Sequence, residues 1–194
     1  MLEWKNLCFS YGEREVLHDL SDTVADGEIL AVMGPSGCGK STLLSLCAGL
    51  LTPTGGSLRC NAKRRSMVFQ EPRLFPWYNV MDNLRAVLPR DIPEEQIQQA
   101  LASVELNDSS HLFPAALSGG MKSRVAIARA IAYDGDLFLL DEPFAALDED
   151  LRVRIATRLR AHLKARNATA LLVTHLQSDA QLLADRIIDL PMHS

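Results

Sequence analysis

One short segment, residues 34–42, constrains the fold more than any other part of the chain. It reads Gly-Pro-Ser-Gly-Cys-Gly-Lys-Ser-Thr and fits the pattern G-x-x-x-x-G-K-[ST] in full. A buried strand is expected before it, over residues 28–33, and a leucine-rich helix after it, over residues 41–51. In this strand–loop–helix context, the backbone N–H groups of a glycine-rich loop bind phosphate. The segment therefore predicts a phosphate-binding loop in an α/β fold.

The polar positions of this loop have distinct expected roles. Lys40 supplies a mobile positive charge for the outer phosphates of ATP, Ser41 offers its hydroxyl to Mg²⁺, and Thr42 contacts the innermost phosphate. A nucleophile elbow, G-x-S-x-G, fits less well because Cys38 stands where a glycine is needed. The expected nucleotide-binding residues of the loop are Gly34, Pro35, Ser36, Gly37, Cys38, Gly39, Lys40, Ser41 and Thr42.

Length and composition restrict the class of protein. The chain has 194 residues, which favours one domain, and 47% of them are apolar, enough for a core of ordinary size. A net charge of −4 argues against a general nucleic-acid binder, so no nucleic-acid partner is expected. The longest apolar run, residues 43–51, is about half of what a membrane span needs, and no secretory signal begins the chain. We expect a soluble chain that reaches a membrane only through a partner, and four scattered cysteines suit a reducing cytosol.

The order of strands and helices predicts a parallel sheet. Residues 2–11 and 14–24 read as short strands, and two more strands are expected within 57–70, around a basic hairpin tip at residues 63–65. Farther on, the expected elements are helix 119–133, strand 136–141, helix 149–166, strand 168–174 and a strand after residue 175. Strands joined by crossover helices form a parallel sheet covered on both faces.

The segment between residues 70 and 118 differs from the rest of the chain. Prolines at positions 72, 76, 89 and 93 interrupt helical stretches such as 94–105, and no strand-like run is present. We interpret residues 71–118 as a mostly helical subdomain inserted into a core that comprises residues 1–70 and 119–194. The whole chain, residues 1–194, is then one domain.

Two carboxylates follow the strand expected at 136–141. Asp141 can hold Mg²⁺ through water, opposite Ser41, and Glu142 can orient or deprotonate an attacking water. The alternative is an ordinary acidic strand end, but Pro143 and the loop 144–148 follow directly and argue against it. The phosphate loop and these carboxylates together indicate hydrolysis of ATP with Mg²⁺.

Further motifs, in order along the chain, resemble those of ATP-binding-cassette (ABC) ATPases. Leu117-Ser-Gly-Gly-Met121 resembles the Leu-Ser-Gly-Gly-Gln signature of this family, and the resemblance runs from about residue 2 to about residue 190. It implies a P-loop NTPase cassette of the α/β class, with a RecA-like parallel-sheet core, an antiparallel β subdomain and the inserted helical subdomain.

The resemblance also implies roles for single residues. Tyr11 matches an aromatic residue that stacks on adenine, Gln70 the glutamine of the Q-loop, and His175 the switch histidine. Asp141 and Glu142 match the magnesium aspartate and the catalytic glutamate. The implied catalytic residues are Glu142, His175, Lys40 and Gln70, the implied metal-binding residues are Ser41, Gln70 and Asp141, and the implied nucleotide-binding residues outside the loop are Tyr11, Ser118, Gly119, Gly120 and Asp148.

Members of this family pair head to tail, so the resemblance implies a second copy of the chain as a partner. Ser118, Gly119 and Gly120 of one copy would cover the γ-phosphate bound by Lys40 of the other, and Asp148 would link the two sites. Met121 departs from the family pattern, which has glutamine there. We expect this departure to weaken polar contacts to the nucleotide of the other copy.

Residues 68–83 resemble the corresponding segment of importer ATPases of the nitrate, sulfonate and taurine group. In these proteins the segment receives coupling helices, so the resemblance implies an integral membrane permease as partner, with an extracytoplasmic solute-binding protein. Pro76 and Trp77 would form an apolar platform beside Gln70, so that the nucleotide state could be transmitted across the contact. The chain would then lie on the cytoplasmic face of the membrane, held there by the permease. The alternative to coupling with a permease is that Phe75 and Trp77 simply pack within the helical subdomain. The competing functional classes are a soluble ABC ATPase acting on DNA or the ribosome and a small-molecule phosphotransferase.

Several charged residues carry no expected chemistry. Six arginines and lysines between Arg152 and Arg166 are expected to form a solvated helix face. The histidines without ligand spacing are expected at the surface; they are His18, His111, His162 and His193.

Overall fold

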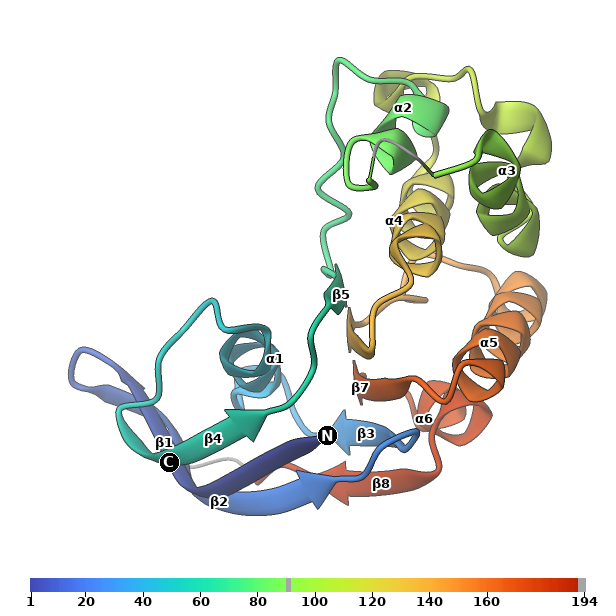
Figure 1. Ribbon diagram of the computed structural model, residues 1–194. Helices are drawn as coiled ribbons and strands as arrows, with labels where there is room; N and C mark the ends of the chain where they lie inside the picture. The colour runs from blue at the N-terminus through green and yellow to red at the C-terminus, as the bar shows by residue number, and fades with distance from the viewer. Residues whose placement is uncertain (90–91, 192–194) are drawn as a thin grey trace.

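Two sheets organise the chain in the computed structural model, which describes residues 1–89 and 92–191 (Figure 1). The first sheet is antiparallel, with the order β2-β1-β4, and the second is parallel, with the order β5-β6-β7-β3-β8. The antiparallel strands are β1 (Leu2–Tyr11), β2 (Arg14–Val24) and β4 (Gly55–Cys60). The parallel strands are β3 (Ile29–Met33), β5 (Arg65–Val68), β6 (Leu137–Asp141), β7 (Thr169–Val173) and β8 (Arg186–Asp189). The predicted α/β fold with a parallel core and an antiparallel sheet is confirmed.

Helices connect the parallel strands and form a second region above them (Figure 1). The connecting helices are α1 (Lys40–Ala48), α4 (Gly119–Tyr133), α5 (Glu149–Ala165) and α6 (Gln177–Leu183). The region above holds α2 (Val80–Arg85), α3 (Glu94–Ser103) and two short 3₁₀ helices, η1 (Asn107–Ser109) and η2 (Pro114–Ala116). The described residues between 70 and 118 contain no strand. The boundary of the helical subdomain at residue 118 stays a prediction, because α4 packs against α2, α3 and β5 alike.

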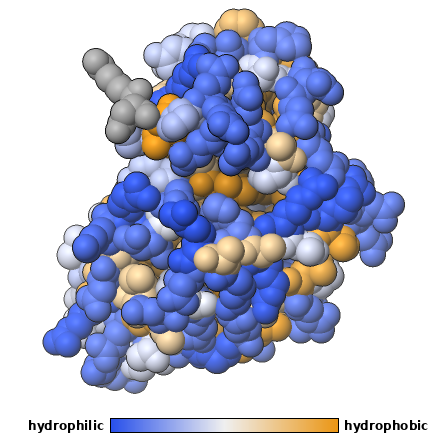
Figure 2. Space-filling view, turned by 45° about the vertical axis from the view of Figure 1, so that its right-hand side comes forward, coloured by the Kyte–Doolittle hydropathy of each residue, from blue (hydrophilic) through white to orange (hydrophobic). Residues whose placement is uncertain are grey.

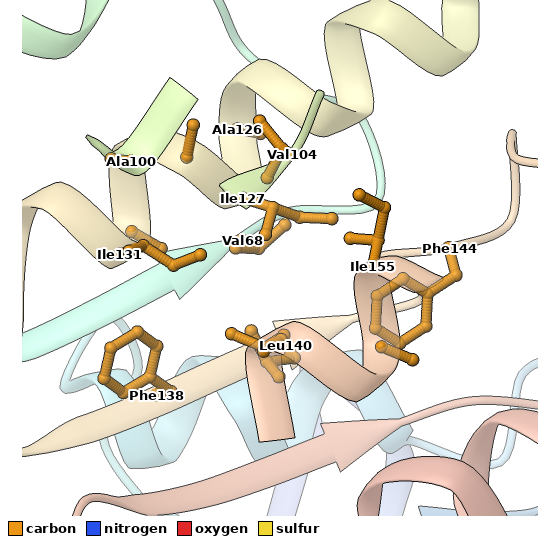
Figure 3. Close-up of a cluster of buried hydrophobic side chains, with 14 of the residues drawn as sticks. Val68, Ala100, Val104, Ala126, Ile127, Ile131, Phe138, Leu140, Phe144 and Ile155 are labelled. Carbon is orange, nitrogen blue, oxygen red and sulfur yellow. The ribbon is translucent and has the colours of Figure 1, made fainter. Parts of the chain in front are cut away.

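Both faces of the parallel sheet are buried, as its apolar strands require. Successive side chains of a strand point to opposite faces. Leu30 and Val32 of β3 therefore join the cluster around α1 and the antiparallel sheet, whereas Ile29 and Ala31 join the cluster around α4, α5 and α6. Figure 3 shows the second cluster, where labelled side chains from β5, β6, α3, α4 and α5 converge.

Two local expectations from the sequence are wrong. The helix after the phosphate loop ends earlier than residue 51, because Gly49 adopts a left-handed conformation and donates its N–H to Leu46 O and Ser45 O. Residues 63–65 are not a hairpin tip, since β4 and β5 belong to different sheets. The chain crosses between the sheets there, and Oδ2 of Asp136 holds the crossing by accepting the backbone N–H groups of Lys63 and Arg64 at 3.0 and 3.1 Å.

The solvated face expected for α5 is present in part: Arg154, Arg158, Lys164 and Arg166 are exposed, and Arg152 and Arg160 are half-buried. All six basic residues pair with carboxylates on other segments, which the sequence did not predict. Helix α5 lies beside α3, α6 and the ends of the sheet, so its long cationic side chains reach acidic groups from several directions. The pairs are Arg152 with Asp179, Arg154 and Arg158 with Glu105, Arg160 and Lys164 with Asp185, and Arg166 with Asp134.

The surface is mostly hydrophilic on the face that carries α3 and α5. Figure 2 shows hydrophobic residues there as scattered patches and in a hollow at mid-height. His18 and His111 are exposed as expected, His162 is half-buried instead, and His193 lies outside the described residues. None of the helices within residues 1–89 and 92–191 combines the length and hydropathy that a membrane-spanning helix requires.

Candidate functional site

The phosphate loop joins β3 to α1, and its glycines are required by local geometry. Gly39 caps the helix with φ of 102°, and a Cβ there would lie 2.7 Å from Leu17 Cδ2. A Cβ at Gly34 would lie 2.7 Å from Leu190 O. Only glycine adopts such conformations without strain and leaves room for the neighbouring chain. The loop backbone can therefore approach an anion at the start of α1.

Lys40 is held inside this loop. Its side chain is buried, and Nζ donates hydrogen bonds to Gly34 O and Pro35 O, each at 2.7 Å. Cys38 Sγ lies 3.8 Å from the same ammonium. The carbonyl groups thus fix a positive charge directly beneath the loop, where phosphate oxygens would be bound.

A cavity of about 310 Å³ opens beside the loop and brings many predicted site residues together. Tyr11 forms one wall: its ring is 54% exposed and meets Phe9 edge to face, at 4.8 Å between centroids. An exposed aromatic face next to a phosphate loop can stack on a nucleobase. The cavity is lined by Tyr11, Arg14, Val16, Ser36, Gly37, Gly39, Lys40, Ser41, Thr42, Gln70 and Glu142.

Sequence reasoning missed Arg14 and Val16 in this lining. The available signal was the turn after Tyr11, because strands that pair across a short hairpin bring Arg14 opposite Tyr11. An arginine at the mouth of a phosphate site adds positive charge for a polyanionic nucleotide.

The two carboxylates lie at the end of β6, as predicted. Asp141 is buried, and its carboxylate is hydrogen-bonded to the hydroxyl of Ser41. Burial raises the pKa of Asp141, which the bond from Ser41 and the charge of Lys40 partly oppose, and the charge of Glu142 raises it further. The contact between Asp141 and Ser41 joins the two groups expected to hold the metal. Hydroxyl and carboxylate oxygens are ligands that suit Mg²⁺.

Glu142 adopts a left-handed backbone conformation, with φ of 45°, that is rare outside glycine. Its N–H bonds to Val173 O at 2.9 Å, and its carboxylate Oε1 lies 2.9 Å from His175 Nδ1. Residues with strained backbone conformations are common at functional sites, where contacts with surrounding residues stabilise the conformation. The strain directs Glu142 into the cavity, next to the half-exposed imidazole of His175.

The second glycine motif lies outside this cavity. Ser118 caps α4, and its Oγ accepts the N–H of Met121 at 3.2 Å. Asp148 caps α5 in the same way, accepting the N–H of Leu151 at 3.0 Å. Ser118, Gly119, Gly120 and Asp148 are all absent from the cavity lining. One chain therefore presents the two predicted halves of the nucleotide site as separate surfaces.

An aromatic turn, residues 75–78, projects from the segment after Gln70. Trp77 is 67% exposed and Pro76 is exposed, which argues against simple packing of Trp77 inside the helical region. The buried Asn83 fixes the turn: its Oδ1 accepts the N–H of Phe75 at 2.8 Å, and its Nδ2 donates to the carbonyls of Phe75, Tyr78 and Asn79. A rigid exposed aromatic group of this kind is typical of a protein-binding surface.

Known proteins resemble this chain in sequence and in architecture. The sequence model of the family described as "ABC transporter" matches residues 17–145. The chain is 43% identical over 186 residues to the aliphatic sulfonates import ATP-binding protein SsuB 2 of Burkholderia lata, covering 92% of this chain and 68% of that protein. It is 46% identical over 188 residues to SsuB of Cupriavidus necator, covering 92% of this chain and 62% of that protein. The chain thus spans about two thirds of the length of these curated relatives.

Two solved structures of one cassette, MJ0796, match over almost the whole chain. One is the dimeric, post-hydrolysis state of an ATP-binding cassette bound to ADP and Pi, with a TM-score of 0.88 and 28% identity. The other is a dimeric bacterial ABC transporter cassette, with a TM-score of 0.89 and 28% identity. Each match covers 98% of this chain and 94% of the solved chain.

Proposed function

Because this chain belongs to the ABC transporter family, we propose that it is the ATP-hydrolysing subunit of an importer for a small sulfonate-like anion. The phosphate loop and its cavity accord with the ATP binding shared by this family. The named relatives are import ATP-binding proteins for aliphatic sulfonates, which supports the sulfonate class of solute.

The contact between Glu142 and His175 beside the phosphate loop carries the proposal. Glu142 accepts a proton from the attacking water, and His175 holds the carboxylate in place through Nδ1. Lys40 binds the outer phosphates, and Gln70 completes the wall of the cavity. Asp141 and Ser41 would hold Mg²⁺, which supplies positive charge to the phosphates when bound.

A second copy of the chain completes each site. The separation of Ser118–Gly120 from the cavity supports this arrangement, because a motif that begins a helix can bind an anion but here does not line the chain's own cavity. The matching solved cassette is dimeric in both of its structures. Asp148 would then lie between the two sites.

A membrane permease is the partner that turns hydrolysis into transport. The aromatic turn supplies an exposed Trp77 on a segment that also carries Gln70, so a helix of the permease can dock near the nucleotide site. The chain would then lie on the cytoplasmic face of the membrane, with an extracytoplasmic solute-binding protein delivering the anion to the permease.

Affinity purification of a tagged Glu142→Gln variant tests this function. The variant should retain ATP and hydrolyse it slowly, so complexes that depend on bound ATP persist. It would be purified with Mg-ATP from solubilised native membranes, and its partners would be identified by mass spectrometry. A wild-type preparation in EDTA is the control.

A stoichiometric multi-span membrane protein is expected. Proteoliposomes containing that complex should take up a short alkanesulfonate in preference to nitrate when ATP is supplied on the side of this chain. Recovery with ribosomes or DNA-repair proteins instead would indicate the soluble ABC ATPase.

A further inference from the structure

Arg129 of α4 reaches across to the segment that follows Gln70. Its Nη1 donates to Arg73 O at 3.2 Å and its Nη2 to Pro72 O at 3.1 Å. Burial lowers the pKa of this guanidinium. No carboxylate among the described residues lies within 4.0 Å of it. Arg129 is half-buried, and its guanidinium donates hydrogen bonds to two carbonyl groups. Such a cation loses hydration for little electrostatic return, so its clearest effect is to fix the position of those carbonyls.

The clamped residues close a small loop around Gln70. Arg73 has a left-handed backbone conformation, with φ of 45°. Its guanidinium lies over the ring of Phe69, 3.9 Å from the centroid, and Phe69 directly precedes Gln70. The stacked pair joins the two ends of the loop. Gln70 therefore extends into the nucleotide cavity from a loop whose base is fixed to α4.

The same segment is fixed again at the aromatic turn. Asn83 bonds to Phe75, Tyr78 and Asn79, and it is completely buried. A cleft of about 310 Å³ lies beside this segment, with Phe69, Arg73, Phe75 and Arg129 in its wall. The segment from Gln70 to Trp77 is therefore held at two places, by Arg129 and by Asn83.

Helix α4 adds the remaining element of the nucleotide site. It begins at the motif Ser118–Gly120, and Arg129 lies further along the same rigid helix. The clamp thus joins the loop after Gln70 to the helix that carries the second glycine motif.

We propose that Arg129 is a positioning residue that ties the Gln70 loop to α4 and so couples nucleotide binding to the aromatic turn. The inference rests on the proposed function only for its physiological meaning. The coupling itself is a property of the isolated chain.

Tryptophan fluorescence tests the coupling directly. The chain has two tryptophans, of which Trp4 is completely buried and Trp77 is 67% exposed. Quenching by acrylamide therefore reports mainly on Trp77, and a Trp77→Phe variant gives the residual signal of Trp4. Quenching would be measured with and without Mg-ATP in the Glu142→Gln background, alongside calorimetric titration of ATP.

The control is a matched arginine on the same helix. Arg124 Nη1 also donates to two backbone carbonyls, those of Val104 and Glu105, but these lie outside the Gln70 segment. Mg-ATP should change the quenching of Trp77 in the parent and in Arg124→Lys. In Arg129→Lys the change should shrink at least about threefold, while ATP affinity shifts less than about twofold.

Three results would overturn the proposal. They are an undiminished change in Arg129→Lys, an equal loss in Arg124→Lys, and no ATP-induced change in the parent. Arg129→Met serves as a second variant, and melting curves identify any variant that fails to fold. Failure of the parent to bind ATP in the titration would instead count against the proposed function.

Discussion

The imidazole Nδ1 of His175 lies 2.9 Å from the carboxylate Oε1 of Glu142, although the two residues are 33 positions apart in the chain. The contact arises because β6 and β7 are neighbours, with Asp141 opposite Val173, and each residue follows the end of its strand. A general base and the group that orients it act as a unit, so their losses should not add.

We therefore predict that Glu142→Gln and His175→Ala each lower the ATPase rate by about 10²-fold or more. The double variant should be no slower than the slower single variant, and all three should bind ATP. Steady-state hydrolysis and ATP titration measure these quantities. Multiplicative losses in the double variant would show that the two side chains act independently.

Asp141→Asn should stabilise the nucleotide-free protein at neutral pH and remove its response to magnesium. Burial raises the pKa of Asp141 above its ordinary value of about 3.9. The folded state then binds this proton more tightly than the unfolded state, so stability falls as pH rises from the unfolded pKa through the folded one. Removing the charge removes this loss of stability. Each kcal/mol gained in the free energy of unfolding should raise the melting temperature by about 2–4 °C.

Thermal unfolding from pH 7 downward measures this effect, and the gain of the variant should shrink as pH falls. Asp136→Asn, just before the same strand, is the control, because Asp136 accepts two backbone N–H groups and its variant should not gain stability. A lower melting temperature for Asp141→Asn at neutral pH would contradict the prediction.

The two signature glycines should respond differently to alanine. A Cβ at Gly120 would lie 2.8 Å from Ala146 O, whereas a Cβ at Gly119 meets nothing within 4 Å. Gly120→Ala should therefore lower the melting temperature, and Gly119→Ala should raise stability by about 0.5–1 kcal/mol through its helix propensity. If both glycines cover the nucleotide of a second copy, both variants should lose ATP-dependent dimerisation. Calorimetric melting and gel filtration separate the two effects.

Met121→Gln should raise the ATPase rate and favour the dimer, because the family pattern places a polar side chain at this position. The structure adds a cost in stability: Met121 packs, partly buried, against the large hydrophobic cluster of α4. Removing that apolar contact should lower the melting temperature. An unchanged rate would show that the methionine does not limit the pairing of two copies.

His162 should make the protein sensitive to mild acid. Burial lowers the pKa of His162; Asp134, 3.5 Å from Nε2, opposes this shift and Arg166 adds to it. The neutral imidazole of His162 therefore contributes to the free energy of unfolding. This contribution is fully present above the unfolded pKa of about 6.5 and is lost as pH falls through the folded pKa. The free energy of unfolding, measured with urea between pH 7.5 and about pH 5, should depend less on pH in His162→Gln than in the wild type. The exposed His111→Gln is the control, and equal profiles for wild type and His162→Gln would disprove the role.

Much of the fold follows from patterns that lie close together in the chain. Helix 119–133 matches α4 residue for residue, and the hairpin of β1 and β2 has the predicted bounds. These elements depend on hydrophobic period, caps and turn residues, which act over a few positions. The helix after the phosphate loop was predicted too long because Gly49, inside a leucine-rich run, was not taken as its end.

The site was predicted to the extent that its motifs are local. The phosphate loop, the paired carboxylates and Tyr11 were all found from short patterns. The cavity is lined by Tyr11, Glu142 and most of the loop, whereas Asp141 is not in its lining. Their chemical roles stay predictions. Arg14 and Arg129 were not found, because neither belongs to a motif and each acquires its place through a partner on another segment.

The sequence by itself determined the order of the elements, the phosphate loop and the chemistry available at each strand end. Only the tertiary structure decided which distant groups meet: His175 with Glu142, Arg129 with the carbonyls after Gln70, and the basic residues of α5 with four separate carboxylates. It also separated the second glycine motif from the chain's own cavity. The physical reason is that periodicity fixes the face on which a side chain lies, whereas its partner depends on how segments far apart in the chain pack together.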